Sequence, residues 1–182
     1  MVGETIEQLG VRDDVVIVTK IYLRETTRDL FQPEIKDLFL QRFEESLSRL
    51  RTYHVDLLLY HAAKTVEEQN NPYIIEAFNE LKEAGKIKHT AVSIHGDDVL
   101  QLNDVVEKNF YDVAMVKMNI AYADNKSHIE DIKNAAKEGV GIIEMKTQCG
   151  GDGRMWWKKH EDSRETLGGL NHKALLKWVM QH

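Results

Sequence analysis

Short apolar runs recur along the chain, and longer stretches with helical periodicity separate them. The runs are rich in Val, Ile, Leu and Met and do not alternate strictly with polar residues. Such runs are typical of strands that are buried on both faces of a parallel sheet. Five runs have this character: Val15–Thr19, Asp56–Tyr60, Thr90–Ile94, Val113–Met118 and Gly141–Met145.

The stretches between the runs predict helices. In Pro33–Leu50 the apolar residues recur at helical spacing, and Pro33 stands near the first turn, where its missing N–H costs little. Gly85 is expected to end another helix as a left-handed cap. The segment Gly150–Gly169, rich in Gly, charge and Trp, predicts a long loop over one end of the sheet. The predicted helices are Gly3–Leu9, Pro33–Leu50, Asn71–Ala84, Asp97–Asn109, Ser127–Glu138 and Asn171–Gln181.

Strict alternation of strands and helices predicts an α/β fold in which crossover helices join parallel strands. The 182 residues suffice for one domain, residues 1–182, with its own core. The net charge is −6 with no long basic run, which argues against a nucleic-acid partner. No apolar run approaches the ~20 residues of a membrane helix, and the acidic N-terminus is unlike a secretion signal, so we expect a cytoplasmic protein without membrane contact. The single cysteine, Cys149, excludes an internal disulfide and a Cys-rich metal site, and we expect no metal.

Each apolar run ends in a polar or ionisable side chain. A strand that reaches water must end in something polar, so any one of these residues has a simple structural explanation. Five together at the carboxyl edge of a parallel sheet point to a ligand-binding edge, because that edge carries the sites of parallel α/β folds. Lys20 and His61 are the sharpest pair, since an ammonium can tune a neighbouring acid while an imidazole binds a carbonyl oxygen. The terminating residues are Lys20, His61, His95, Asn119 and Lys146.

Several segments in order resemble the aldo-keto reductase superfamily: VVIVTK, then SLSRLRTYHVDLLLYH, then AFNELKEAGKIKHTAVSIH. The Ser-x-His form at Ser93–His95 and the Met-Lys at Met145–Lys146 look closest to a bacterial and archaeal branch. The resemblance implies a partial (β/α)8 TIM barrel with five parallel strands that alternate with helices. It also implies hydride transfer between NADP(H) and a small carbonyl substrate.

The resemblance also implies roles for individual residues. Lys20 and His61 match the family's active-site lysine and histidine. Ser93 and Asn119 match positions that hydrogen-bond the nicotinamide carboxamide, and Lys146 follows them as a further cofactor-binding residue. Met145 stands where many members stack an aromatic ring on the nicotinamide, which is a departure from the pattern.

The family keeps a catalytic Tyr and Asp upstream of the strand that carries Lys20, and its adenosine-side loop follows a later strand. We therefore expect this chain alone to reduce carbonyls poorly and to hold NADP(H) weakly. A complete barrel typically needs about 250 residues. The alternative is a non-catalytic barrel remnant that binds a protein partner or itself through open sheet edges. We expect four side chains to face the barrel interior: Ile17, Leu58, Val92 and Val116.

Overall fold

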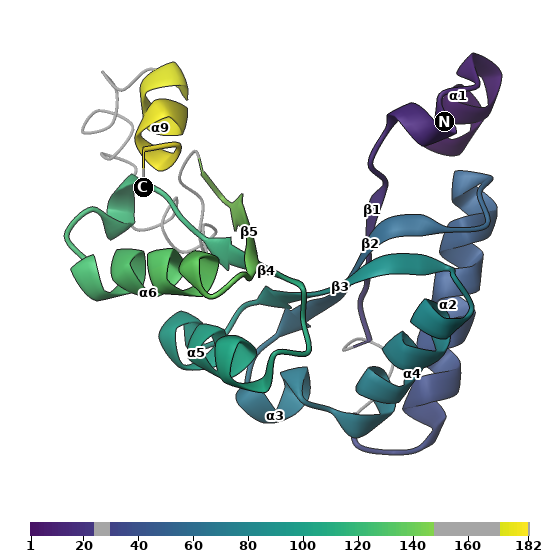
Figure 1. Ribbon diagram of the computed structural model, residues 1–182, viewed down its shortest axis with the longest axis horizontal. Coiled ribbons are helices and arrows are strands. Elements are labelled where there is room, and N and C mark those ends of the chain that lie inside the picture. The colour runs from purple at the N-terminus through teal and green to yellow at the C-terminus, as the bar shows by residue number, and fades with distance from the viewer. Residues whose placement is uncertain (24–29, 148–171, 182) are drawn as a thin grey trace, which may run out of the picture.

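The computed structural model describes residues 1–23, 30–147 and 172–181 (Figure 1). In this part of the chain five strands form one sheet, every neighbouring pair is parallel, and the order in space is the order in sequence. This arrangement confirms the predicted five parallel strands joined by crossovers. The strands are β1 (Val18–Ile21), β2 (Val55–Ala63), β3 (Ile87–Ile94), β4 (Val113–Lys117) and β5 (Gly141–Met145).

Helices lie around the outside of the curved sheet, with α2 and α4 along one part of it and α5 and α6 along the next (Figure 1). Side-chain caps set several of their starts: Asn71 accepts from the Tyr73 N–H at 3.0 Å, and Asp97 accepts from the Leu100 N–H at 3.0 Å. Gly85 has the expected left-handed φ of 67° after the fourth helix. The helices are α1 (Val2–Leu9), α2 (Glu34–Leu50), α3 (Val66–Gln69), α4 (Pro72–Glu83), α5 (Asp98–Lys108), α6 (Lys126–Lys137) and α9 (His172–Val179), with short 3-10 turns at η1 (Arg12–Asp14) and η2 (Ile120–Tyr122).

The sheet separates two apolar clusters. The larger one lies between strands and helices and includes the buried rings of Phe39, Phe43 and Phe78. The smaller one lies on the opposite, inner face of the sheet and is formed by Leu57, Leu59, Ala91 and Met115, with Val113, Ile143 and Met145 packed against it.

The prediction of the inward-facing residues was wrong. Ile17, Leu58, Val92 and Val116 all belong to the cluster under the helices. Side chains alternate between the faces of a strand, so a choice that is off by one position moves the whole set to the other face. A continuous apolar run carries no alternation from which the correct face could be read.

The first strand begins at Val18, three residues after the predicted start at Val15, and it includes Lys20. Before the strand, a carboxylate takes the place of one of the backbone hydrogen bonds to a neighbouring strand. The Ile17 N–H donates to Asp56 Oδ2 at 2.8 Å, and the Ile17 carbonyl accepts from the Asp56 and Leu57 N–H groups. Val16 is 76% exposed, which is unlike a residue in the middle of a buried strand.

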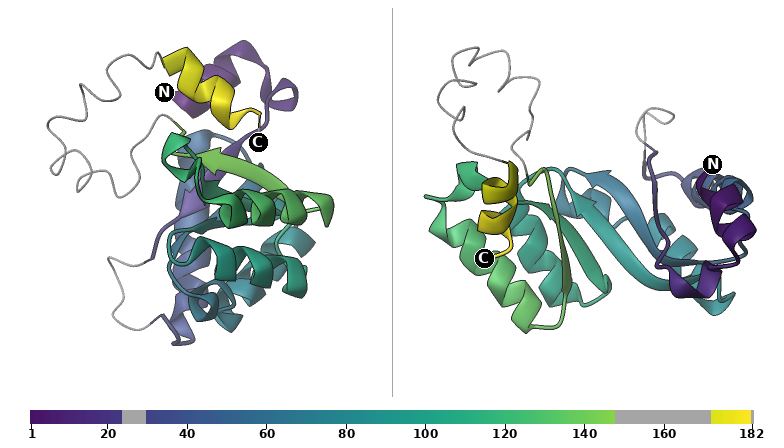
Figure 2. Two further views of the ribbon diagram at one scale, coloured as in Figure 1. Left: turned by 90° about the vertical axis from the view of Figure 1, so that its left-hand side faces the viewer. Right: turned by 90° about the horizontal axis from the view of Figure 1, so that it is seen from above.

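The sheet curves strongly, as both views in Figure 2 indicate. Lys20 on β1 reaches Met115 on β4, with 3.5 Å between Nζ and Sδ, although two strands lie between them. A side chain can make that contact only across the hollow face of a barrel-like sheet. Near its end, β2 is irregular: Ala62 has a φ of 65° and the register with β3 shifts there.

Some expectations concern residues outside the described part of the chain, namely the Gly150–Gly169 loop, Cys149 and the Asn171 cap. Among the helices that are described, none combines the length and apolar character needed to cross a membrane.

Candidate active site

Lys20 and His61 lie on neighbouring parallel strands near the carboxyl edge of the sheet. Lys20 pairs in register with Leu59, so His61 is two residues further along β2. Leu59 is on the inner face, and residues two apart share a face, which places both side chains on the inside of the curve. The two residues lie on neighbouring strands as expected, but both stand within their strands rather than directly after them, because β1 extends to Ile21 and β2 to Ala63.

The charge on Lys20 acts on its neighbours. Lys20 is exposed, and within the described part of the chain its ammonium group contacts the Met115 sulfur and pairs with no carboxylate. His61 is half-buried, and its pKa is lowered first by burial and then by the positive charge of Lys20. The imidazole of His61 is therefore neutral at neutral pH and has an N–H to donate.

Three rings form a row along this edge. The ring of Tyr22 meets that of His61 edge-on at 5.4 Å between centroids, and the ring of His95 meets His61 from the other side at 5.7 Å and 80°. No hydrogen bond joins Tyr22 to Lys20 or His61 within the described residues, although Tyr22 shares their face of the sheet. The sequence predicts His95 as a polar residue at the end of a strand without a specific role, and it does not place Tyr22 in the site; the signal for Tyr22 is its position two residues after Lys20.

The predicted cofactor residues follow on the next strands. Ser93 is fully buried on the inner face of β3, and its Oγ has no hydrogen-bond partner in the described part of the chain. Asn119 directly follows β4 and is 3% exposed. An unsatisfied buried hydroxyl costs about 1–3 kcal/mol, so Ser93 fits a site that receives a polar ligand group such as a carboxamide.

Met145 and Lys146 complete the edge at β5. Met145 packs with the inner-face cluster, and its carbonyl accepts from the Met118 N–H at 3.1 Å. Lys146 has a left-handed φ of 60°, a conformation uncommon outside glycine and often found near functional sites. Met145 therefore presents a flexible thioether where a flat ring would stack, and an apolar contact with a ring remains available to it.

A buried ion pair fixes the loops beside these residues. Lys117, the last residue of β4, lies 3.2 Å from the carboxylate of Asp98 at the start of α5, and both side chains are nearly buried. Burial raises the pKa of Asp98, while the charge of Lys117 opposes that shift. The imidazole of His128 bonds the Lys117 carbonyl at 2.8 Å. Together these contacts tie the segment before Asn119 to two helices.

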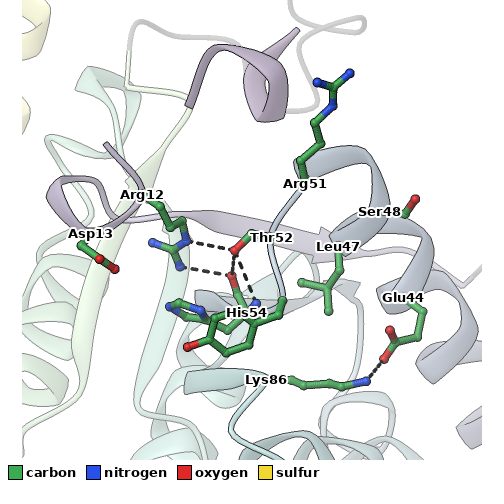
Figure 3. Close-up of a pocket in the computed structure, with 10 residues that line it drawn as sticks. Arg12, Asp13, Glu44, Leu47, Ser48, Arg51, Thr52, His54 and Lys86 are labelled. Atoms are coloured by element: carbon green, nitrogen blue, oxygen red, sulfur yellow. Dashed lines mark hydrogen bonds and ion pairs between the residues drawn. The ribbon is translucent and has the colours of Figure 1, made fainter. Parts of the chain in front are cut away.

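A cavity of about 810 Å³ lies at the opposite end of the strands (Figure 3). Its lining residues include Arg12, Thr52, His54 and Lys86, which precede the strands. The cations are already paired: Arg12 with Asp56 at 3.1 Å and Lys86 with Glu44. Since it is at the amino end of the sheet, this cavity is separate from the candidate active site.

Comparison with known proteins places this edge in context. The aldo/keto reductase family model matches residues 1–166. The chain is 33% identical over 96 residues to "Aldo-keto reductase YhdN" of Bacillus subtilis, covering 51% of this chain and 28% of that protein. It is 31% identical over 93 residues to "Methylglyoxal reductase DkgB" of Salmonella typhimurium, covering 50% of this chain and 32% of that protein.

The fold comparison agrees. An aldo/keto reductase from Klebsiella pneumoniae, solved with NADP and acetate, has a TM-score of 0.65 and 22% identity over 100% of this chain and 60% of its own. A curved sheet of parallel strands with helices outside it, and a polar carboxyl edge, define part of a (β/α)-barrel. The chain belongs to the aldo/keto reductase family. Its matches span about a third of the curated relatives.

Proposed function

We propose that this chain forms the reduction site of an NADP(H)-dependent carbonyl reductase that acts on a small aldehyde or ketone. The observation that carries the proposal is the Lys20–His61 pair on neighbouring strands at the inner carboxyl edge. A relative named as a methylglyoxal reductase and a structural neighbour solved with NADP support the reaction class and the cofactor. We further propose a cytoplasmic location.

His61 is the group that binds the carbonyl oxygen. Its lowered pKa keeps it neutral, so it donates an N–H without carrying a charge into the site. Lys20 brings the positive charge that stabilises the negative charge developing on that oxygen. It also favours the ionised form of any acid beside it, which makes such an acid a better proton donor at neutral pH.

The next three strands hold the nicotinamide. The Ser93 hydroxyl and the Asn119 amide receive the carboxamide, Met145 contacts the ring, and Lys146 contributes a positive charge for the anionic part of the cofactor. The bound reduced nicotinamide supplies the hydride. These four residues would hold the nicotinamide at the same edge of the sheet as His61, so that the cofactor and the carbonyl group would share one site.

This chain lacks the residue that donates a proton to the substrate in a complete site of the family. The family's Tyr and Asp have no counterpart among the residues that match the family's motifs here, and Tyr22 makes no hydrogen bond to Lys20 or His61. General acid catalysis typically contributes roughly 10²–10⁴-fold. We therefore propose that the 182-residue chain binds NADP(H) weakly and reduces aldehydes slowly.

One observation favours a second function, that of a self-associating module. Val16, two residues before β1, and Val18, the first residue of β1, are 76% and 43% exposed. In the described sheet, β1 pairs with β2 alone. An exposed apolar strand at a sheet edge is a template for another strand, so this second function is a homo-oligomer paired through β1.

The test is binding of NADPH to the purified chain, followed by the fluorescence of the nicotinamide. We expect saturable binding that weakens in Ser93→Ala, because alanine removes the hydroxyl without adding bulk at this buried position. Leu100→Ala, at an exposed site on α5, is the matched control and should bind as the wild type does. Absence of saturable binding, with concentration-dependent association instead, would replace the enzyme proposal with the second function.

A further inference from the structure

The end of β3 concentrates unsatisfied polar atoms. Of the four buried side-chain atoms without a hydrogen-bond partner in the described residues, three lie within a six-residue stretch: Ser93 Oγ, His95 Nε2 and Asp98 Oδ1. A buried polar atom left without a partner destabilises the fold, and native structures contain few of them. Ser93 and Asp98 already have a place in the cofactor site and its supporting ion pair, whereas His95 has none.

The backbone around His95 is held rigidly. The His95 N–H donates to the Ala63 carbonyl at 2.8 Å, and the Gly96 N–H donates to Gln101 Oε1 at 3.0 Å. Gln101 is itself buried, and its amide donates to the Ala63 carbonyl at 3.3 Å and to Gln69 Oε1 at 3.1 Å. This buried network clamps the ends of β2 and β3 together on both sides of His95.

Gly96 shows how close the clamp is. A Cβ at this position would lie 1.7 Å from the Lys64 carbonyl oxygen, a backbone atom that cannot move away cheaply. The backbone at Gly96 therefore leaves no space for a side chain, and the Cα of the neighbouring His95 is held in one place. Fixed backbone under a polar side chain is what positions a group for a ligand.

The ring of His95 lies near His61, which is proposed to bind the substrate carbonyl, and near Lys146, which is proposed to bind the cofactor. It is 5.7 Å from His61 on one side, and the charges of Lys146 and Lys117 act on it from the other. Burial and these charges, together with those of His61 and Lys20, lower the pKa of His95 to about 4, so the ring is neutral at neutral pH. The His95 residue is half-buried, and rotation about its Cβ–Cγ bond is soft, so a nitrogen can turn toward a ligand.

We propose that His95 is a specificity-determining residue that hydrogen-bonds a second oxygen of the substrate, on the carbon next to the carbonyl that His61 binds. The proposal rests on the proposed function. Each hydrogen bond joins an oxygen to an imidazole nitrogen at about 3 Å. Rings 5.7 Å apart can therefore hold two oxygens on neighbouring carbons at once. His95 therefore confers a preference for carbonyl compounds that carry an oxygen on the neighbouring carbon over simple alkyl carbonyls of the same shape.

The test compares two ketones of similar shape, hydroxyacetone and butanone, as ligands of the purified chain in the presence of NADP+. Binding is followed by the imidazole NMR signals of His61 and His95. A neutral hydrogen bond contributes about 0.5–1.5 kcal/mol, so we expect hydroxyacetone to bind roughly 2- to 10-fold more tightly. His95→Phe, which keeps the ring, should bring this ratio to about one, and His95→Gln, which keeps a donor, should restore part of it.

The outcomes separate the two proposals. If both ketones bind equally well to the wild type, the carbonyl site stands and the role of His95 is refuted, whether or not the variants fold. A preference that persists unchanged in His95→Phe also refutes it. If neither ketone changes the His61 signal at any concentration tested, the proposed function fails and the role of His95 fails with it.

Discussion

Asp56→Asn should destabilise the fold, because one carboxylate joins three segments at the start of the sheet. Asp56 accepts from the Ile17 N–H at 2.8 Å and pairs with Arg12 at 3.1 Å and with Lys88 at 2.6 Å. Its side chain is 11% exposed, so solvent screens these contacts little. The amide would keep the shape and lose the charge.

The magnitude follows from the pKa of Asp56. Burial alone would raise it, but the bonds from Lys88 and Ile17 and the charge of Arg12 outweigh burial and lower it from 3.8 to about 2. A shift of this size corresponds to roughly 2 kcal/mol of stability at neutral pH. Because the folded-state pKa is the lower one, this stability is present above the unfolded-state value of 3.8 and is lost as the pH falls toward 2.

Urea unfolding of the wild type and Asp56→Asn at several pH values measures the effect. We expect a difference of about 2 kcal/mol at neutral pH that narrows below pH 3.8. Asp13→Asn, an exposed residue of the same region, is the control and should change stability by less than about 0.5 kcal/mol. The reasoning would be refuted if Asp56→Asn lowered the free energy of unfolding no more than Asp13→Asn does, or if the loss did not depend on pH.

Three further predictions follow from other parts of the molecule. Gly96→Ala should shift or unfold the end of β3, because its Cβ would meet the Lys64 carbonyl oxygen; thermal unfolding should show a loss well beyond the roughly 1 kcal/mol of a typical substitution. Val18→Lys should weaken self-association in light scattering without changing the far-UV spectrum, whereas Val15→Lys, just outside β1, should weaken it less. The free energy of unfolding should fall as the pH drops from 6.5 to about 4, because the folded state keeps His95 neutral while the unfolded state protonates it, and His95→Gln should make this fall smaller. An equal fall in His95→Gln and the wild type would contradict this prediction.

The sequence sufficed for the architecture because apolar runs and helical periodicity are local. The strand at Gly141–Met145 was predicted with its observed bounds. Asn71 and Asp97 were predicted as the first residues of helices, and in the structure they are the N-caps of α4 and α5. The start of β1 was missed because Asp56, 39 residues away from Ile17 in sequence, supplies the bond that a strand partner would otherwise make. Such a long-range contact leaves no local pattern.

Some residues of the candidate site could likewise be found from the sequence, and others could not. Lys20, His61 and Ser93 could be found because each follows or ends an apolar run and matches a family motif. The neighbours that surround His61 could not, since the row of Tyr22, His61 and His95 depends on the curvature of the sheet and on the irregular end of β2. Which side chains of each strand face the inside of the sheet could not be predicted either, because the strands are apolar on both faces.

The most direct test of the central claim is the pKa of His61, measured by NMR in the wild type and in Lys20→Met. Methionine keeps the length of the side chain and removes its charge, and that charge lowers the pKa of His61. We predict that the pKa of His61 rises in Lys20→Met and does not change in Lys64→Met, where the lysine is on the loop after β2. An unchanged pKa of His61 in Lys20→Met would show that the two residues do not share a site, and the proposed reduction site would be wrong.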